Sequence, residues 1–68
     1  MSVGENLRVL RGEKSQAEVA NAVNISVSAL SMYEQDQRIP RDEVKIRLAE
    51  YFNVSIESLF FAQEHHKM

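Results

Sequence analysis

The sequence has no cysteine, two glycines and one proline among its 68 residues. Without cysteine the chain can form neither a disulfide framework nor a thiolate metal site, which fits a reducing cytoplasm. No apolar run is longer than a few residues, so we expect neither a secretory signal nor a membrane-spanning helix. The chain also has no glycine-rich loop for a phosphate and no spacing typical of a nucleophile and its base. We therefore expect a cytoplasmic protein that is not an enzyme and uses no cofactor or metal.

An excess of positive charge is also missing. Eight Lys and Arg residues stand against ten Asp and Glu residues, so the formal net charge is −2, whereas many nucleic-acid-binding domains are strongly basic. Residues 16–35 contain no Lys or Arg at all. If this segment contacted nucleic acid, the attraction to phosphates would come from its flanks. A modest non-specific affinity and a shallow salt dependence would follow.

The residues that are present suit one small helical core. The hydrophobic content is 44%, but a chain of this length is near the lower limit for independent folding, which favours compact helices or an oligomer. Two Ser-x-x-Glu capping patterns begin at Ser2 and Ser15, and apolar residues then recur at helical spacing. The fold class is therefore all-α, with helices expected at residues 3–11, 16–23, 26–35, 41–52 and 56–61.

Residues 16–35, QAEVANAVNISVSALSMYEQ, predict two short helices with a tight corner between them. The run Val23-Asn24-Ile25 interrupts the helical pattern, and the hydroxyl of Ser26 can accept a hydrogen bond from the first amides of the next helix. On a helical wheel the second helix has two faces. Leu30, Tyr33 and Glu34 lie on one face, and Ser28, Ser31, Met32 and Gln35 lie on the other, with Val27 at its edge.

This stretch resembles the helix-turn-helix of the phage-repressor DNA-binding domains, the Cro, cI or Xre-like family. The likeness rests on a polar opening residue, a small residue where two helices approach, a set of apolar positions and the segment SMYEQDQRIP, close to S-x-x-E-x-G-x-R-x-P. The polar opening residue is Gln16 and the small residue is Ala20. The apolar positions are Val19, Val23, Ile25, Leu30 and Tyr33. Asn24 stands where the family usually has Gly. Asp36 stands where the family usually has Gly or Asn. Both types tolerate a left-handed backbone, so each turn stays feasible.

The resemblance implies a compact five-helix, lambda-repressor-like domain over residues 1–62, followed by a polar tail at residues 63–68. It implies that the helix over residues 26–35 enters the major groove of double-stranded DNA. The expected base-reading residues are Val27, Ser28 and Met32, although Met32 could instead lie in the core or at a dimer contact. The expected phosphate contacts are Gln16, Ser31, Gln35, Arg38 and Arg41. Gln16 could instead be an ordinary exposed side chain, Arg38 and Arg41 could be solvated charges, and Ser31 and Gln35 could contact bases. A structural ion pair between Arg11 and Glu34 is also implied.

The C-terminal residues carry more apolar surface than a short helix can bury alone. Core packing explains Phe60, whereas Ile56 and Phe61 could form a self-complementary patch for a homodimer. The adjacent His65 and His66 make a poor metal chelate, because no Cys or carboxylate cluster joins them.

Two functions fit these observations. The first is a prokaryotic or phage-encoded, nucleoid-associated transcriptional regulator, a repressor that binds an operator as a homodimer with two reading helices about 34 Å apart. The alternative is a helix-turn-helix antitoxin or adaptor whose main partner is a protein, which the acidic balance and the uncharged second helix of the motif would allow. DNA binding at low salt separates the two.

Overall fold

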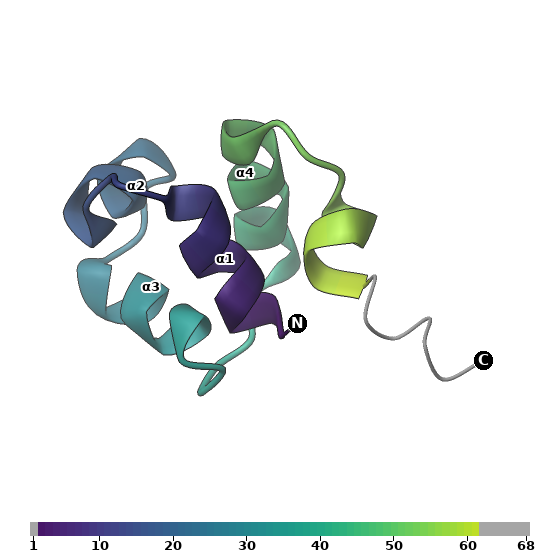
Figure 1. Cartoon of the computed structure of the whole chain (residues 1–68), viewed down its shortest axis with the longest axis horizontal. Coiled ribbons are helices and arrows are strands. Elements are labelled where there is room, and N and C mark those ends of the chain that lie inside the picture. Colours follow the sequence, from purple (N-terminus) through teal and green to yellow (C-terminus); the bar gives the residue numbers. More distant parts are fainter. Residues whose placement is uncertain (1, 62–68) are drawn as a thin grey trace.

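The computed structural model describes residues 2–61, and these residues form a compact set of helices (Figure 1). The elements are α1 (Val3–Arg11), α2 (Gln16–Ala22), α3 (Val27–Glu34), α4 (Asp42–Phe52) and a short π-helix, η1 (Glu57–Phe61). Each bound lies within one residue of its prediction, so the all-α expectation is confirmed. The tail at residues 63–68, with its two histidines, lies outside the described residues.

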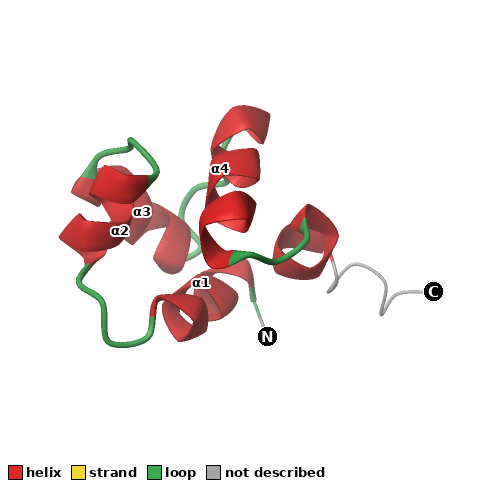
Figure 2. Cartoon of the chain, turned by 90° about the horizontal axis from the view of Figure 1, so that it is seen from above, coloured by secondary structure: helices red, strands yellow, loops and turns green. Residues whose placement is uncertain are grey.

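The first helix, α1, lies in the middle of the molecule and not at one end (Figures 1 and 2). In both views α2 and α3 lie at one end and η1 lies at the other, with α1 and α4 between them (Figures 1 and 2). Each of the five elements contributes one large, fully buried aliphatic side chain to the core. These are Leu7, Val19, Leu30, Leu48 and Leu59. The predicted core residue Phe60 is buried as well, with 6% of its surface exposed.

Serine hydroxyls begin four of the five elements. Ser2, Ser15 and Ser26 accept hydrogen bonds from the backbone N–H three residues ahead, at 3.1, 3.0 and 3.0 Å. In α1 the Glu5 carboxylate also accepts from the N–H of Ser2 at 2.8 Å, which completes a capping box. Ser55, which precedes η1, accepts in the same way from the N–H of Ser58 at 3.0 Å. Since each such cap contributes about 1 kcal/mol, local sequence alone fixes where these elements begin.

The corners require a backbone with positive φ. Asn24 has a φ of 62° and Asp36 a φ of 60°, so both substitutions for glycine adopt the left-handed conformation expected of them. Gly12, which follows the last residue of α1, has a φ of 59°. The chain therefore breaks between α2 and α3 as a corner and does not continue as one helix.

A close contact between α1 and the end of α3 was not predicted. A Cβ on Gly4 would lie 2.3 Å from the backbone oxygen of Glu34, so only glycine fits at this crossing. Next to it, the N–H of Gly4 donates to the Asp36 carboxylate at 2.9 Å. The turn that follows α3 is thus held against the first turn of α1.

The Asp36 carboxylate makes stability depend on pH. Hydrogen bonds from the Ser2 hydroxyl and the Gly4 N–H lower the pKa of Asp36 below 3.8. A lowered pKa contributes stability above the unfolded-state pKa, and this contribution is lost as the pH falls through the folded-state pKa. We expect Asp36→Asn to lower the melting temperature near pH 7 and to differ less from the wild type as the pH falls below about 3.8.

Thermal unfolding measured from pH 7 to pH 3 tests this expectation. Glu13→Gln is the matched control, because Glu13 is an exposed loop carboxylate that makes no hydrogen bond to any described residue. A constant difference between Asp36→Asn and wild type across this range would contradict the role given to the carboxylate.

Candidate nucleic-acid interface

Three contacts stabilise the corner between α2 and α3. The N–H of Ile25 donates to the carbonyl of Ala20 at 2.9 Å, across the turn. Ala20 is fully buried where the two helices meet. From α4, the Nε of Arg47 donates to the carbonyl of Val23 at 2.9 Å, a contact that sequence reasoning missed. Because the turn is fixed, α3 is held at one angle to α2.

The outer face of α3 carries the predicted base-reading residues. Val27 is 43% exposed, Ser28 is exposed and Met32 is half-buried. On the opposite face Leu30, Tyr33 and Glu34 are all buried, as the helical wheel predicted. The outer face thus offers one hydroxyl and two apolar groups and carries no charge.

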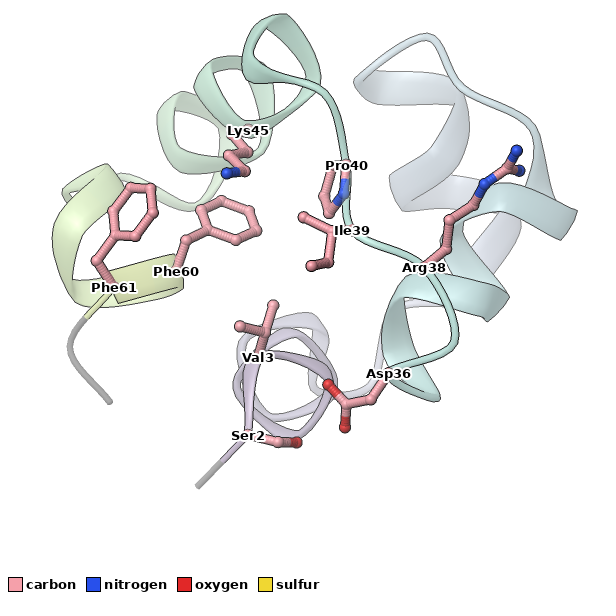
Figure 3. Close-up of a pocket in the computed structure, with 9 residues that line it drawn as sticks. All are labelled: Ser2, Val3, Asp36, Arg38, Ile39, Pro40, Lys45, Phe60 and Phe61. Carbon is pink, nitrogen blue, oxygen red and sulfur yellow. The ribbon is translucent and has the colours of Figure 1, made fainter. Parts of the chain in front are cut away.

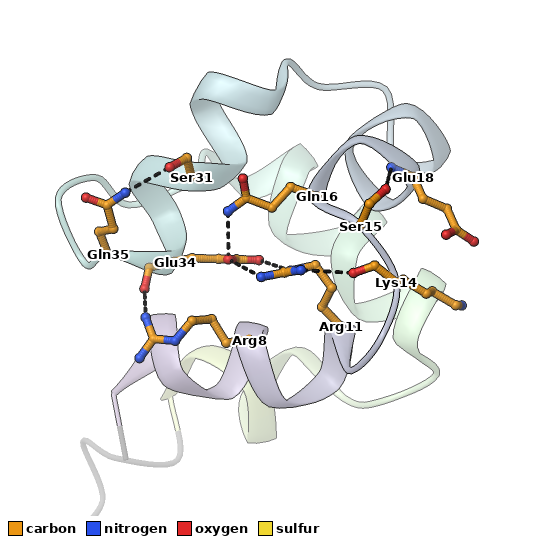
Figure 4. Close-up of polar contacts among 9 residues, drawn as sticks. All are labelled: Arg8, Arg11, Lys14, Ser15, Gln16, Glu18, Ser31, Glu34 and Gln35. Carbon is orange, nitrogen blue, oxygen red and sulfur yellow. Dashed lines mark hydrogen bonds and ion pairs between the residues drawn. The ribbon is translucent and has the colours of Figure 1, made fainter.

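Two further polar residues of this face contact each other. The amide Nε2 of Gln35 donates to the hydroxyl oxygen of Ser31 at 2.8 Å (Figure 4). A hydroxyl that accepts in this way can still donate its own hydrogen. Ser31 therefore has a donor to offer, and Gln35 keeps one N–H and its carbonyl oxygen.

A buried carboxylate connects α3 to the helices before it (Figure 4). Only 2% of the surface of Glu34 is exposed. Its carboxylate accepts from the Nε and Nη2 of Arg11 at 2.7 and 3.0 Å, so the implied ion pair is present as a two-bond contact. The hydrogen bond to Glu34 raises the pKa of Arg11 above its ordinary value. Arg8 also donates to the backbone carbonyl of Glu34.

Gln16 belongs to the same network. Its Nε2 donates to Glu34 at 3.0 Å, from the first residue of α2. One N–H of the Gln16 amide is thereby used inside the protein and the other remains for an outside acceptor. The structure brings Gln16, Arg11 and Glu34 together at one point, which orients α3 relative to α1 and α2.

The cations that flank α3 fall into two groups. Arg38 and Arg41 are exposed in the loop after α3, and their side chains make no hydrogen bond or ion pair with any described residue. With Arg47 they line a polar recess beside Tyr33. Lys14 and Lys45 lie over aromatic rings, and Lys45 is also within 4.0 Å of the Asp42 carboxylate. The Nζ of Lys14 donates to the Tyr51 hydroxyl at 3.1 Å, and this hydrogen bond raises the pKa of Lys14.

The described helices hold neither a metal-binding cluster nor a membrane span. Among residues 2–61 no cluster of three His, Asp or Glu side chains could hold a metal ion. No helix in the same range is long and apolar enough to cross a membrane.

Comparison with known proteins places these features in a family. Residues 5–59 match the family model described as helix-turn-helix. The chain is also 35% identical over 66 residues to the HTH-type transcriptional regulator ImmR of Bacillus subtilis (strain 168), an alignment that covers 94% of this chain and 52% of that protein. The chain therefore spans about half the length of this relative. No solved structure gives a significant match.

Proposed function

Because the chain belongs to the helix-turn-helix family, a DNA-binding and non-enzymatic class, we propose that it is a transcriptional repressor that binds its operator as a homodimer. The observation that carries this proposal is the outer face of α3, which is exposed, uncharged and held at a fixed angle by Glu34 and the corner at Asn24. The operator would be a pseudo-palindrome in bacterial or phage DNA, with half-sites about 34 Å apart. Bound protein would repress by blocking access to the promoter.

Val27, Ser28 and Met32 are the proposed base-reading residues. A serine hydroxyl can both donate to and accept from base edges in the major groove, and the apolar ends of Val27 and Met32 can pack on thymine methyl groups. Because no cation on α3 can form a bidentate contact with guanine, we expect the half-site to depend on thymine positions more than on guanine positions.

The proposed phosphate contacts surround this face. They are Gln16, Ser31, Gln35, Arg38 and Arg41. Only the two arginines are charged, which makes four charged contacts per dimer. Each neutralised phosphate contributes about −0.9 to the slope of log affinity against log salt, so the dimer should show a slope of about −4.

Removing the reading groups should weaken operator binding without unfolding the protein. We expect the double variant Ser28→Ala/Met32→Ala to lose at least about tenfold in operator affinity, because each base contact is worth about 1–3 kcal/mol. Its melting temperature should stay close to that of the wild type, since Ser28 is exposed and Met32 half-buried. Gel-shift titrations with operator and scrambled duplexes measure the change.

Val9→Ala is the control for this experiment, because Val9 is 63% exposed on α1 and lies outside the reading face. It should bind operator as the wild type does. If the double variant loses affinity for scrambled and operator duplexes equally, Ser28 and Met32 do not read bases.

The absence of a cation on α3 also fits the alternative, an antitoxin or adaptor with a protein partner. The same gel shift at two salt concentrations decides between the proposals. No shift at low salt, together with a stable complex with a protein, would favour the alternative.

A further inference from the structure

We propose that two copies of this chain pair through the face that surrounds Ile39, here called the Ile39 face. It is formed by Val3, Ile39, Pro40, Lys45, Ile46 and Phe61. The inference rests on the homodimer of the proposed function and assigns its surface. It extends the sequence expectation: Phe61 belongs to this face and Ile56 lines its second recess, whereas the loop after α3 had no part in the expected patch.

An apolar recess occupies the centre of this face (Figure 3). It measures about 290 Å³ and lies between the first residues of α1, the loop after α3, α4 and η1. Its apolar lining consists of Val3, Ile39, Pro40, Phe60 and Phe61. In Figure 3 the side chains of Val3, Ile39 and Phe60 point into one common space. The recess is thus continuous with the core but open to the outside.

Ile39 is the most exposed large apolar residue in the described part of the chain. It keeps 80% of its surface exposed, although it borders the recess. Ile46, 44% exposed, lines a second shallow recess that shares Lys45 and Phe61 with the first. Two of the four exposed large apolar residues therefore gather on one face, a concentration that marks interaction surfaces.

Lys45 belongs to this face through its stem. Only 13% of its side chain is exposed, and its Nζ lies 4.8 Å from the centre of the Phe61 ring and 5.6 Å from that of Phe60. Lysine stems commonly cover apolar surface in this way while the charge stays outside. The side chain joins the two recesses, which makes them one surface.

The charges at the rim favour a second copy of the chain as the occupant. Two acidic residues, Asp36 and Asp42, stand beside two basic ones, Arg38 and Lys45. A two-fold axis brings the same patch of both copies together, so the patch must attract itself. Because the Nζ of Lys45 lies 4.0 Å from the Asp42 carboxylate of its own copy, the charge along the rim is balanced, and two such rims do not repel each other. An exposed apolar residue and an apolar recess on the same face give the matching shape.

Pairing at Ile39 would also act on DNA binding. The loop after α3 carries Arg38 and Arg41, and these line the polar recess on the other side of Ile39. Burying Ile39 in a partner would hold this loop in one conformation, and with it the two proposed phosphate contacts. By thermodynamic linkage, DNA that binds the ordered loop should then strengthen the dimer.

The variant Ile39→Asp tests the surface. Sedimentation equilibrium over a wide range of concentrations should show a monomer–dimer equilibrium for the wild type. For Ile39→Asp the dimer dissociation constant should rise at least about tenfold, because a charge replaces a central apolar contact. Helicity and melting temperature should not change, since the residue is 80% exposed.

Val9→Asp is the matched control, because Val9 is also an exposed aliphatic residue but lies on α1, beside Asn6 and Ser58. It should dimerise as the wild type does. Equal dimerisation of wild type and Ile39→Asp would overturn the inference, and so would a wild type that stays monomeric at every concentration. Equal losses for Ile39→Asp and Val9→Asp would overturn it as well.

Binding to DNA separates this inference from the proposed function. Here the uncharged variant Ile39→Asn is used, because a carboxylate beside Arg38 and Arg41 would itself repel phosphates. On a duplex with one half-site, at protein concentrations where the wild type is monomeric, Ile39→Asn should bind as the wild type does. On the full operator it should lose at least about tenfold in affinity. If Ile39→Asp still dimerises, the surface is wrong and the repressor proposal stands. If it breaks the dimer but the wild type shows no preference for any DNA sequence, the surface stands and the repressor proposal fails.

Discussion

Gly4→Ala should remove about 3 kcal/mol or more of the free energy of unfolding, although alanine is the better helix former. Helix propensity alone would stabilise this position by about 1 kcal/mol. The new Cβ, however, would lie 2.3 Å from the carbonyl oxygen and 2.7 Å from the carbonyl carbon of Glu34. Both are backbone atoms, which cannot move aside without moving α3. The cost of this steric clash therefore exceeds the gain in helix propensity, so the substitution lowers the free energy of unfolding.

Chemical denaturation of Gly4→Ala measures this loss. A small domain of this size has few kcal/mol to lose, so a large unfolded fraction at 37 °C is expected. A variant as stable as the wild type would show that α1 and α3 do not approach as closely as described.

Arg11→Met should destabilise the protein by about 3 kcal/mol, because it leaves a carboxylate buried without its cation. Methionine retains the aliphatic stem of Arg11, so the loss reports the ion pair more than the packing. Glu34 keeps its hydrogen bond from Gln16 at 3.0 Å, but a neutral amide does not balance the charge. DNA affinity should fall as well, because Glu34 orients α3.

The double variant Arg11→Met/Glu34→Gln isolates the cause. If the unpaired charge is what destabilises Arg11→Met, neutralising Glu34 should restore part of the stability. The two single variants and the double variant form a mutant cycle. A double variant no more stable than Arg11→Met would mean that the loss comes from packing.

Local features of the fold could be read from the sequence. The hydroxyls of Ser2, Ser15 and Ser26 act on amides three residues away, so a short window contains both partners. The positive φ of Asn24 and Asp36 also follows from residue type, since these side chains tolerate the left-handed region. The buried and exposed faces of α3 follow from helical spacing. The contact of Arg11 with Glu34 came from the family resemblance, because the two residues are 23 positions apart.

Features that depend on packing between distant segments could not be read. Nothing near Gly4 in the sequence indicates that the backbone of Glu34 passes over it. The bond from Arg47 to the carbonyl of Val23 joins residues 24 apart, and no local pattern predicts it. The exposure of Ile39 was missed for the same reason. An isoleucine beside a proline suits a core as well as a surface, and only the positions of α4 and η1 decide between them.

Selection of bound duplexes from a random pool tests the central claim most directly. The claim is that the outer face of α3 reads base edges in two symmetric half-sites. The wild type should enrich one inverted repeat with half-sites one helical turn apart, and Ser28→Ala/Met32→Ala should lose that preference while remaining folded. Enrichment of the same repeat by both proteins would contradict the claim, because the bases would then be read by another part of the chain.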